Sequence, residues 1–361
     1  MRLGIDAHIL GKNAGGVERF VSHLVSHLPA ELPDWEIVAY VGKHYAPGLS
    51  PTPVPNLSFR TLASANPLIE RSLLLPALCR ADRLDVLLVQ RLAPWFCGRT
   101  RLVTVVHDIT PIKYPQAYRG LTNRLVRLLT ADSVRRSALV LTPTRSVADE
   151  VATRYGESRD KFLPFYNGID GRCFRPASAP QKEDYLLIAG ALEARKNMET
   201  VFRARARLGN ALPWAIRIVG GVRDPAYKQS LCDLATELGI ADQVHWLGFV
   251  DDEALVQLYQ RARLYLTASR DEGFNIPPLE ALACGTPVCC SDIPVHRELF
   301  DGAAFFFDTK SDESLAAALL RAAQGGQDAA MSEAARRCVE RFTWPAMARK
   351  VGARLAEQFG P

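Results

Sequence analysis

Two glutamates, Glu272 and Glu280, are separated by seven residues within the segment EGFNIPPLE. An ionised carboxylate only accepts hydrogen bonds and can accept from two neighbouring hydroxyl groups at once. Pro277 and Pro278 between them favour the first turn of a helix, whose backbone amides bind anions. This combination suits a ligand that carries both phosphate and hydroxyl groups. The alternative is that Glu280 is only a favourable first-turn charge for the helix dipole.

A basic pair, Arg195 and Lys196, follows an apolar run and precedes a helical pattern that starts near Asn197. Such a pair could neutralise a diphosphate that departs during a reaction. The alternative is an exposed basic pair without a ligand. The net acidic charge of the second half of the chain favours the functional interpretation, because a diphosphate bound there still needs positive charge.

Three further residues follow apolar runs in the first half. His107 could bond a sugar hydroxyl or stabilise developing charge, although a structural histidine is the alternative. Gly15 and Gly16 would let the backbone approach a phosphate or a sugar, and a tight turn is the alternative.

The sequence contains no GxGxxG, GxxxxGK[ST] or GxSxG motif, which argues against dehydrogenases, P-loop kinases and α/β-hydrolases.

Short runs rich in Val, Ile and Leu alternate with longer helical patterns, which is typical of parallel α/β folds. Strands are expected at 2–6, 36–41, 85–89, 102–106, 138–142, 185–189, 215–219, 243–247, 263–267 and 287–290. Segment 163–182 interrupts the pattern with Gly, Pro and Asn-Gly and marks a domain boundary. Ligands of such folds bind at the carboxyl ends of the strands, so the candidate residues are expected there.

Six segments, in order along nearly the whole chain, resemble motifs of the retaining glycosyltransferases with the GT-B fold known as glycosyltransferase family four. They are GGVERF at 15–20, VVHDITPIKYP at 105–115, FYNGID at 165–170, GALEARKN at 190–197, LGFV at 247–250 and EGFNIPPLEALACGTPV at 272–288. The resemblance implies two Rossmann-like parallel-sheet domains that face each other across a cleft. Residues 1–165 would bind the acceptor, 166–345 would bind a nucleotide sugar, and a helix at 346–361 would pack back toward the first domain.

The resemblance also implies roles for individual residues. Glu280 would bind the ribose hydroxyls and Glu272 the hydroxyls of the donor sugar, while Arg195 and Lys196 would neutralise the diphosphate. His107 would lie beside the donor sugar. The remaining donor contacts would come from the following residues: Gly273, Phe274 and Asn275 through their amides, Gly248 and Phe249 near the base, and Gly15 and Gly16. One position departs from the pattern, because many members carry an arginine where this chain has Ala191.

The function expected from the resemblance is transfer of a hexose, mannose or a related deoxyhexose from a GDP-sugar, with its configuration retained. The acceptor would be a glycan or lipid-linked oligosaccharide in cell-surface polysaccharide synthesis. A UDP-sugar-dependent enzyme of the same fold, a sugar-nucleotide epimerase and a catalytically silent scaffold remain alternatives. No metal or other cofactor is expected, because no Asp-x-Asp follows a strand.

The charge is uneven along the chain. Residues 1–161 hold 21 basic and 14 acidic residues, whereas the remaining 200 hold 23 and 25. The basic region 113–136 suggests attraction to an anionic membrane surface. A solvated face on a core helix at 118–137 is the alternative, with a buried apolar stripe formed by Leu121, Leu125, Leu128 and Leu129. Nucleic acid is not expected as a partner, because no aromatic residues interleave with the charges.

The location expected from the sequence is cytoplasmic, and the family resemblance implies a peripheral position at the inner face of the plasma membrane. No stretch of about 18 uncharged apolar residues is present, so no membrane-spanning helix is expected. The eight cysteines include no CxxC pair and no cluster at zinc-ligand spacing. They are therefore expected to be reduced and to lie mostly in the core.

Overall fold

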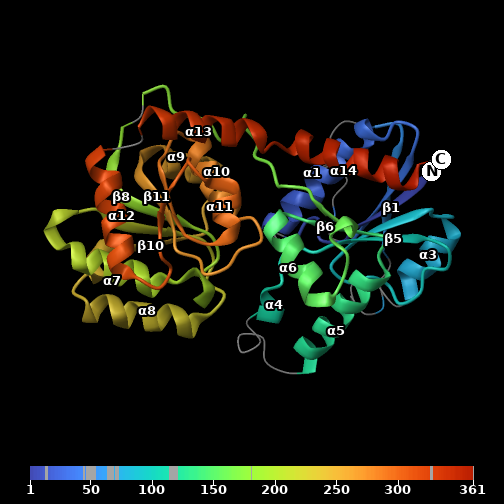
Figure 1. Ribbon diagram of the computed structural model, residues 1–361, viewed down its shortest axis with the longest axis horizontal. Coiled ribbons are helices and arrows are strands. Elements are labelled where there is room, and N and C mark those ends of the chain that lie inside the picture. Colours follow the sequence, from blue (N-terminus) through green and yellow to red (C-terminus); the bar gives the residue numbers. More distant parts are fainter. Residues whose placement is uncertain are drawn as a thin grey trace. The chain divides into compact units, whose positions relative to one another are not determined.

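The computed structural model describes residues 1–12, 15–43, 45, 54–62, 69, 73–113, 121–179, 181–325 and 328–360. The chain forms two compact units. Unit 1 comprises Met1–Gly168 together with Trp344–Pro361, and unit 2 comprises Ile169–Thr343. Each unit contains one parallel sheet with helices packed around it (Figure 1).

The sheet of unit 1 has seven strands in the order β3-β2-β1-β4-β5-β6-β7. Every neighbouring pair is parallel, so the strand-to-helix loops after β1, β4 and β5 lie next to one another at one edge. The strands are β1 (Arg2–Ala7), β2 (Glu36–Val41), β3 (Leu57–Thr61), β4 (Val86–Gln90), β5 (Arg101–Val105), β6 (Leu139–Thr142) and β7 (Phe162–Pro164).

Helices of unit 1 come from both ends of the chain. The last helix packs against the first, and Trp344 stacks on His23 with ring centroids 4.3 Å apart. Figure 1 shows these two helices, α14 and α1, side by side. The helices are α1 (Gly16–Glu31), α3 (Leu75–Ala81), α4 (Thr110–Lys113), α5 (Leu121–Arg136), α6 (Arg145–Tyr155), the 3-10 turn η3 (Arg159–Lys161) and α14 (Trp344–Phe359).

Unit 2 has a six-stranded parallel sheet in the order β10-β9-β8-β11-β12-β13. Its strands are β8 (Glu183–Ala189), β9 (Ala215–Val219), β10 (Val244–Gly248), β11 (Ala262–Thr267), β12 (Val288–Ser291) and β13 (Phe305–Phe307). Its helices are α7 (Met198–Leu208), α8 (Pro225–Glu237), α9 (Asp252–Arg261), α10 (Ile276–Ala283), α11 (Pro294–Phe300), α12 (Asp312–Gly325) and α13 (Ala329–Arg341). The 3-10 turns are η4 (Ala194–Lys196), η5 (Gly209–Ala211) and η6 (Ala241–Gln243).

All ten strands expected from the sequence are present, within one or two residues at each end. The sequence missed β3, β7 and β13, which are short and lie at sheet edges. An edge strand pairs on one side only, and β7 ends in Pro164, whose missing N–H is tolerated there. Segment 47–58 is rich in proline, which predicts a surface loop. Residues 47–53 lie outside the described residues, and the last two residues of the segment belong to β3.

The prediction that the leucines of α5 form a buried apolar stripe was wrong. Leu128 is 69% exposed and Leu125 is also exposed, whereas Leu129 is half-buried. The buried face of α5 instead carries Thr130, Ser133 and Val134, and Ser137 directly after the helix is also buried. These small side chains bond to neighbouring segments: the Ser133 hydroxyl accepts from the Ala93 amide at 2.8 Å, and the hydroxyls of Ser137 and Thr104 lie 2.7 Å apart. The side chain of Leu121 lies outside the described residues.

All eight cysteines are free thiols, and six of them are buried, as expected. None of the helices in the described part of the chain combines the length and hydrophobicity needed to span a bilayer.

Candidate active site

Unit 2 gathers the predicted charged residues at the carboxyl ends of two adjacent strands. β8 leads through Gly190 into η4, which carries Arg195 and Lys196, and β11 leads into the loop that carries Glu272. Because β8 pairs with β11, the two loops meet, and the Arg270 amide donates to the Arg195 carbonyl at 2.9 Å. The pairing of β8 with β11 therefore brings the Arg195–Lys196 motif and the Glu272 motif together.

Glu272 is the centre of this cluster. Its Oε1 accepts from Lys196 Nζ at 2.7 Å and from the Ser269 hydroxyl at 2.8 Å. Its Oε2 lies 2.6 Å from Arg195 Nη1, which also donates to the Asp271 carbonyl. Each carboxylate oxygen therefore has a cationic partner before any ligand binds.

Burial and charge act in opposite directions on this carboxylate. Glu272 is 8% exposed, and burial alone would raise its pKa. Lys196 and Arg195, with the hydrogen bonds from Lys196 and Ser269, outweigh burial and lower the pKa of Glu272 below its usual range. Glu272 is therefore an anion at neutral pH and can only accept hydrogen bonds.

A close backbone approach beside this cluster requires glycine. The backbone of Gly220, after β9, has a φ of +134°, and a Cβ there would lie 2.1 Å from the Gly190 carbonyl oxygen. The loops after β8 and β9 can therefore touch only without a side chain at Gly220. Lys196 Nζ lies just beyond, 3.5 Å from where a Cβ of Gly190 would be.

The second glutamate does not have the simpler role considered from the sequence. The first turn of α10 contains no acidic residue, and Glu280 lies one turn further along. Glu280 is 2% exposed and its Oε2 accepts from the Tyr259 hydroxyl at 2.9 Å. The first-turn dipole interpretation of Glu280 was therefore wrong. The prolines lie in the first turn of α10 as predicted, and Gly285, with a φ of 74°, follows the C-cap residue Cys284 as the predicted terminating glycine.

The segment before α10 is held by a buried polar chain that the sequence did not reveal. Asn275 has a φ of 70° and does not cap the helix with its side chain. Its Nδ2 instead donates to the Thr267 hydroxyl at 3.1 Å and lies 2.9 Å from His296 Nε2. The Nδ1 of His296 lies 3.0 Å from the Ser291 carbonyl, and burial lowers the pKa of His296 to about 4.

Phe274 contributes to this loop through packing. Its ring is buried and contacts Phe342 edge-on, with centroids 5.7 Å apart. Only its backbone amide is therefore left to meet a ligand. Gly273, Phe274 and Asn275 are the three residues directly before α10, where backbone amides bind anions.

A cavity of about 190 Å³ opens at the carboxyl ends of β9 and β10. Its lining is mostly apolar, and Lys228 Nζ lies 5.5 Å from the centre of the Trp246 ring. The lining residues are Leu192, Ile218, Gly220, Val222, Lys228, Trp246, Leu247 and Gly248. Of the two predicted residues here, Gly248 lines the cavity, whereas Phe249 does not and is 86% exposed. Trp246 and Lys228 were missed, because neither belongs to a recognisable motif.

In unit 1, His107 lies just past the end of β5. Its Nε2 is 2.9 Å from Gln90 Oε1 at the end of β4. Burial, followed by the positive charge of Arg91, lowers the pKa of His107 to about 4. Asp108 bonds Arg91 at 2.9 Å and accepts from the Thr110 amide at 3.2 Å, so it organises this loop.

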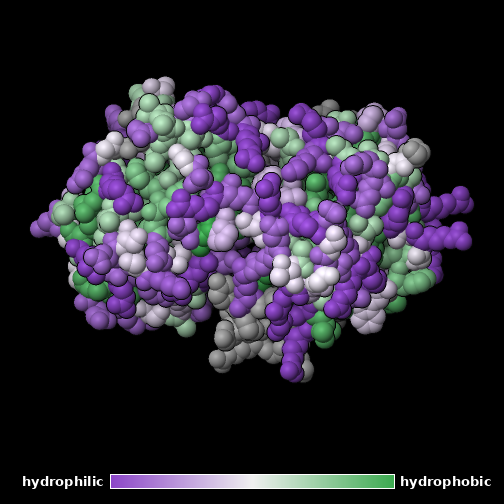
Figure 2. Space-filling view, in the orientation of Figure 1, coloured by the Kyte–Doolittle hydropathy of each residue, from purple (hydrophilic) through white to green (hydrophobic). Residues whose placement is uncertain are grey.

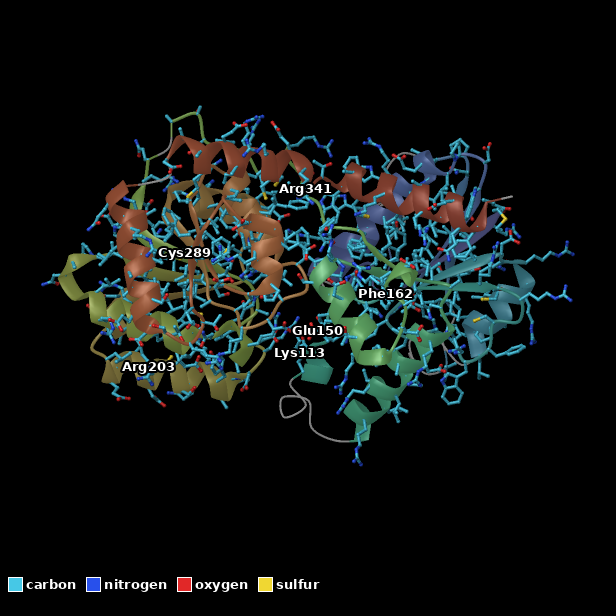
Figure 3. The ribbon with its side chains drawn as sticks, viewed as in Figure 1. Lys113, Glu150, Phe162, Arg203, Cys289 and Arg341 are labelled. Atoms are coloured by element: carbon cyan, nitrogen blue, oxygen red, sulfur yellow. The ribbon has the colours of Figure 1, made fainter. Side chains whose placement is uncertain are left out.

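Two other regions lie at the same edge of unit 1. Gly15 has a φ of +63° and is the N-cap of α1, a backbone conformation that favours glycine, and Gly16 begins the helix. A cavity of about 450 Å³ is lined by Ile109, Lys113, Asp149, Glu150, Thr153 and Arg154. Figure 3 shows Lys113 of α4 and Glu150 of α6 next to one another, and their charged groups are 2.7 Å apart.

Comparison with known families agrees with this arrangement. A model described as Glycosyltransferase Family 4 matches residues 14–171, and one described as Glycosyl transferases group 1 matches residues 173–338. The chain belongs to glycosyltransferase family four. The family resemblance read from the six motifs is thereby confirmed.

Relatives of this family four chain include two O-antigen enzymes. The O-antigen chain mannosyltransferase RfbU of Salmonella typhimurium is 33% identical over 221 residues, which are 61% of this chain and 60% of that protein. The O-antigen chain mannosyltransferase B of Escherichia coli is 26% identical over 240 residues, 62% and 61% of the two chains. The matches thus span about three fifths of the length of these relatives.

Solved structures share the fold of this family four chain. Sucrose-phosphate synthase from Thermosynechococcus elongatus has a TM-score of 0.76 at 20% identity, covering 99% of both chains. Anabaena Alr3699/HepE, in complex with UDP and glucose, has a TM-score of 0.74 at 19% identity, again over 99% of both chains. The prediction of two Rossmann-like, parallel-sheet domains of the GT-B type is confirmed.

Proposed function

We propose that the chain is a retaining glycosyltransferase that moves a hexose from a nucleoside diphosphate sugar to a glycan acceptor. The observation that carries the proposal is the Glu272 cluster, in which a buried carboxylate is held by Lys196 and Arg195 beside the helix start of α10. These groups supply hydroxyl acceptors, cations and amide donors within one loop system. That is the chemistry a sugar diphosphate requires.

The donor would lie along the carboxyl edge of the unit 2 sheet. The cavity lies at β10 and β9, the glycine contact between β9 and β8, and the Glu272 cluster between β8 and β11. With strands about 4.8 Å apart, cavity and cluster are separated by roughly 10 Å. A base in the cavity would thus place its diphosphate and sugar near the cluster.

Each charged group has a role in this arrangement. Lys196 and Arg195 would stabilise the diphosphate as it gains charge on departure, helped by the amides before α10. Glu272 would accept hydrogen bonds from donor-sugar hydroxyls and Glu280 from the ribose. Because the two basic side chains already supply positive charge, no metal ion is required. The described residues contain no group of three or more His, Cys, Asp or Glu side chains arranged to hold a metal.

His107 would contribute from unit 1 as a neutral hydrogen-bonding group. Its lowered pKa keeps the imidazole uncharged at pH 7, and Gln90 fixes the ring orientation. It would bond a hydroxyl of the transferred sugar and stabilise charge that develops on the ring. Retention of configuration does not require His107 to be a nucleophile.

The donor that we propose is GDP-mannose or a related GDP-deoxyhexose, supported by the relatives named as O-antigen mannosyltransferases. Isothermal titration with GDP and UDP tests the base, and tighter binding of UDP would contradict this choice. Incubation of GDP-mannose or UDP-glucose with octyl hexosides, followed by mass spectrometry, tests transfer. The anomeric configuration of the product, read by NMR, tests retention. Absence of any glycosylated product would overturn the proposed function.

The acceptor that we propose is a glycan or lipid-linked oligosaccharide, bound by unit 1 beside an anionic membrane surface. α5 presents Leu125 and Leu128 to solvent together with exposed Arg124 and Arg135. Figure 2 shows hydrophobic residues among hydrophilic ones over α5. Exposed leucines beside arginines suit a lipid surface better than the charges alone would. Arg119 of the predicted region lies outside the described residues.

A further inference from the structure

The cavity at β9 and β10 in unit 2 has a single charged side chain on its wall, among the residues that the structure describes. That side chain is Lys228 of α8, whose Nζ lies 5.5 Å from the centre of the Trp246 ring. No carboxylate, amide or hydroxyl side chain is among the described residues that line the cavity. Lysine and tryptophan donate hydrogen bonds and accept none. The side chains of this wall therefore suit a ligand that presents hydrogen-bond acceptors.

The fold of unit 2 does not explain why a lysine lies here. Lys228 is the fourth residue of α8, and a positive charge in the first turn of a helix is unfavourable for the helix dipole. Lys228 is half-buried, and within the described part of the chain its ammonium contacts the Trp246 ring but no carboxylate. The face of an aromatic ring attracts a cation without accepting all of its N–H groups. The ammonium therefore still has donors to offer to a ligand.

Backbone amides on the same wall are already used. The Gly220 amide donates to the Gly248 carbonyl at 2.8 Å, and the Leu192 amide donates to the Gly221 carbonyl at 2.9 Å. These bonds hold the loops after β8, β9 and β10 to one another. They leave the ammonium of Lys228 as the charged donor that a ligand in the cavity meets.

We propose that Lys228 makes the site selective for nucleotides with guanine or uracil over those with adenine or cytosine. The inference rests on the proposed function, because it needs the base of a nucleoside diphosphate in this cavity. Guanine presents O6 and N7 as acceptors on one edge, and uracil presents O4, as thymine does. In place of that keto oxygen, adenine and cytosine carry an amino group, whose N–H groups would point at the ammonium.

Isothermal titration of two matched pairs of nucleotides, GDP with ADP and UDP with CDP, tests this selectivity. Within each pair the ribose and the diphosphate are identical, so Lys196 and the other groups at the Glu272 cluster contribute equally. The ratio of the two dissociation constants therefore reports on the base alone. The wild-type chain should bind GDP about tenfold more tightly than ADP, and UDP about fivefold more tightly than CDP, because correct hydrogen bonds to a base discriminate by such factors.

Inosine diphosphate separates the keto edge of guanine from its exocyclic amino group. Inosine diphosphate keeps O6 and N7 but lacks the amino group at C2. Its dissociation constant should therefore lie within about threefold of that of GDP, because the acceptors for Lys228 are the same. An affinity as low as that of ADP would assign the selectivity to the amino group and overturn the role of Lys228.

Three variants test the side chain itself. Lys228→Met removes the charged donor but keeps a long side chain, so both ratios should fall to within about twofold of one. Lys228→Arg keeps a cationic donor that bonds the same edge of guanine, and it should retain the preference for GDP over ADP. The control is Lys310→Met, because Lys310 is exposed after β13, at the opposite edge of the same sheet. Its ratios should equal those of the wild-type chain.

The outcomes separate this inference from the proposed function. Thermal melting shows whether each variant is folded. Wild-type ratios near one, or unchanged ratios in folded Lys228→Met, would overturn the role of Lys228 and leave a nucleotide site in place. If the wild-type chain binds none of these nucleotides, the proposed function itself fails.

Discussion

The two sheets carry different chemistry at the same structural position, the carboxyl ends of their strands. In unit 2, Glu272 is an anion with Lys196 and Arg195 on its two oxygens. In unit 1, His107 is a neutral ring held by the uncharged amide of Gln90. The predicted site residues are therefore charged at the unit 2 edge, whereas the predicted histidine at the unit 1 edge is neutral and exchanges hydrogen bonds.

This difference follows from what each proposed ligand brings. A nucleoside diphosphate always carries negative charge, so a site for it can hold its cations in place before binding, at the cost of pairing them with Glu272. A sugar is uncharged, so the groups that bind it need to exchange hydrogen bonds and not to balance a charge. A neutral imidazole suits that task, and burial keeps His107 neutral by lowering its pKa to about 4.

The largest expected effect comes from removing charge at the unit 2 edge. Lys196→Met should lower kcat for transfer by about 1,000-fold, because a preorganised group on a departing charge is worth about 10² to 10³ in rate. Arg195 would still pair with Glu272, so the fold should remain. Lys182→Met is a matched control, since Lys182 precedes β8 at its amino end, whereas Lys196 follows it at the carboxyl end.

Steady-state kinetics with a saturating donor measures this effect. Near-normal turnover in Lys196→Met would remove the contrast between the two edges. Equal losses in the Lys182 and Lys196 variants would point to a general effect on unit 2 instead of on the diphosphate.

The second prediction concerns His296, a neutral group inside the charged edge. Its pKa is lowered to about 4 by burial, from 6.5 in the unfolded chain. The stability it contributes is therefore complete above pH 6.5 and is lost as the pH falls toward 4. Between pH 7 and pH 5 this amounts to about 2 kcal/mol, because each pKa unit is worth about 1.4 kcal/mol.

Urea unfolding of the wild-type chain and His296→Asn at pH 7 and pH 5 measures this contribution. His296→Asn should be less stable at pH 7, but it should lose about 2 kcal/mol less than the wild-type chain on acidification. His245→Gln, with an exposed histidine replaced, should follow the wild-type chain. An identical pH dependence in His296→Asn would show that the ring is not held neutral.

The sequence predicted those parts of the fold that depend on local pattern. Buried parallel strands are continuous apolar runs, so β8, β11 and the rest of both sheet centres were identified. The Glu272 cluster was also predictable, because Arg195, Lys196 and Glu272 each belong to a motif. Their mutual ion pairs were not, because these depend on the pairing of β8 with β11.

Features decided by tertiary packing were missed or misjudged. The leucines of α5 predicted a buried face, yet the contacts are made by Ser133 of the helix and by Ser137 directly after it. Their hydroxyls bond the loop before β5 and β5 itself. The cavity at β9 and β10 could not be predicted, since Lys228 of α8 and Trp246 of β10 meet only in the folded unit. A local sequence pattern does not determine which face of a helix or strand packs against a neighbouring element.

A third prediction tests whether the cavity at β9 and β10 binds the base of the donor. Trp246→Ala should weaken GDP binding by about tenfold, because stacking of a base on an aromatic ring is worth about 1–3 kcal/mol. The adjacent exposed residue offers a control, and His245→Gln should leave binding unchanged. Isothermal titration measures both. Unchanged affinity in Trp246→Ala would place the base elsewhere.

The smallest expected effect concerns the outer surface of unit 1, where α5 shows arginines and leucines to solvent. Arg124→Gln should weaken binding to phosphatidylglycerol vesicles by about fivefold, since a basic residue near an anionic surface contributes about 1 kcal/mol. Binding of GDP should not change, because the donor groups lie in unit 2. Arg349→Gln on α14 is the control, as another exposed arginine of unit 1. Vesicle sedimentation against phosphatidylcholine measures the difference. Equal losses in both variants would mean that the net charge of unit 1, and not the α5 surface, attracts it to lipid. The two units would then differ in their chemistry only at their sheet edges.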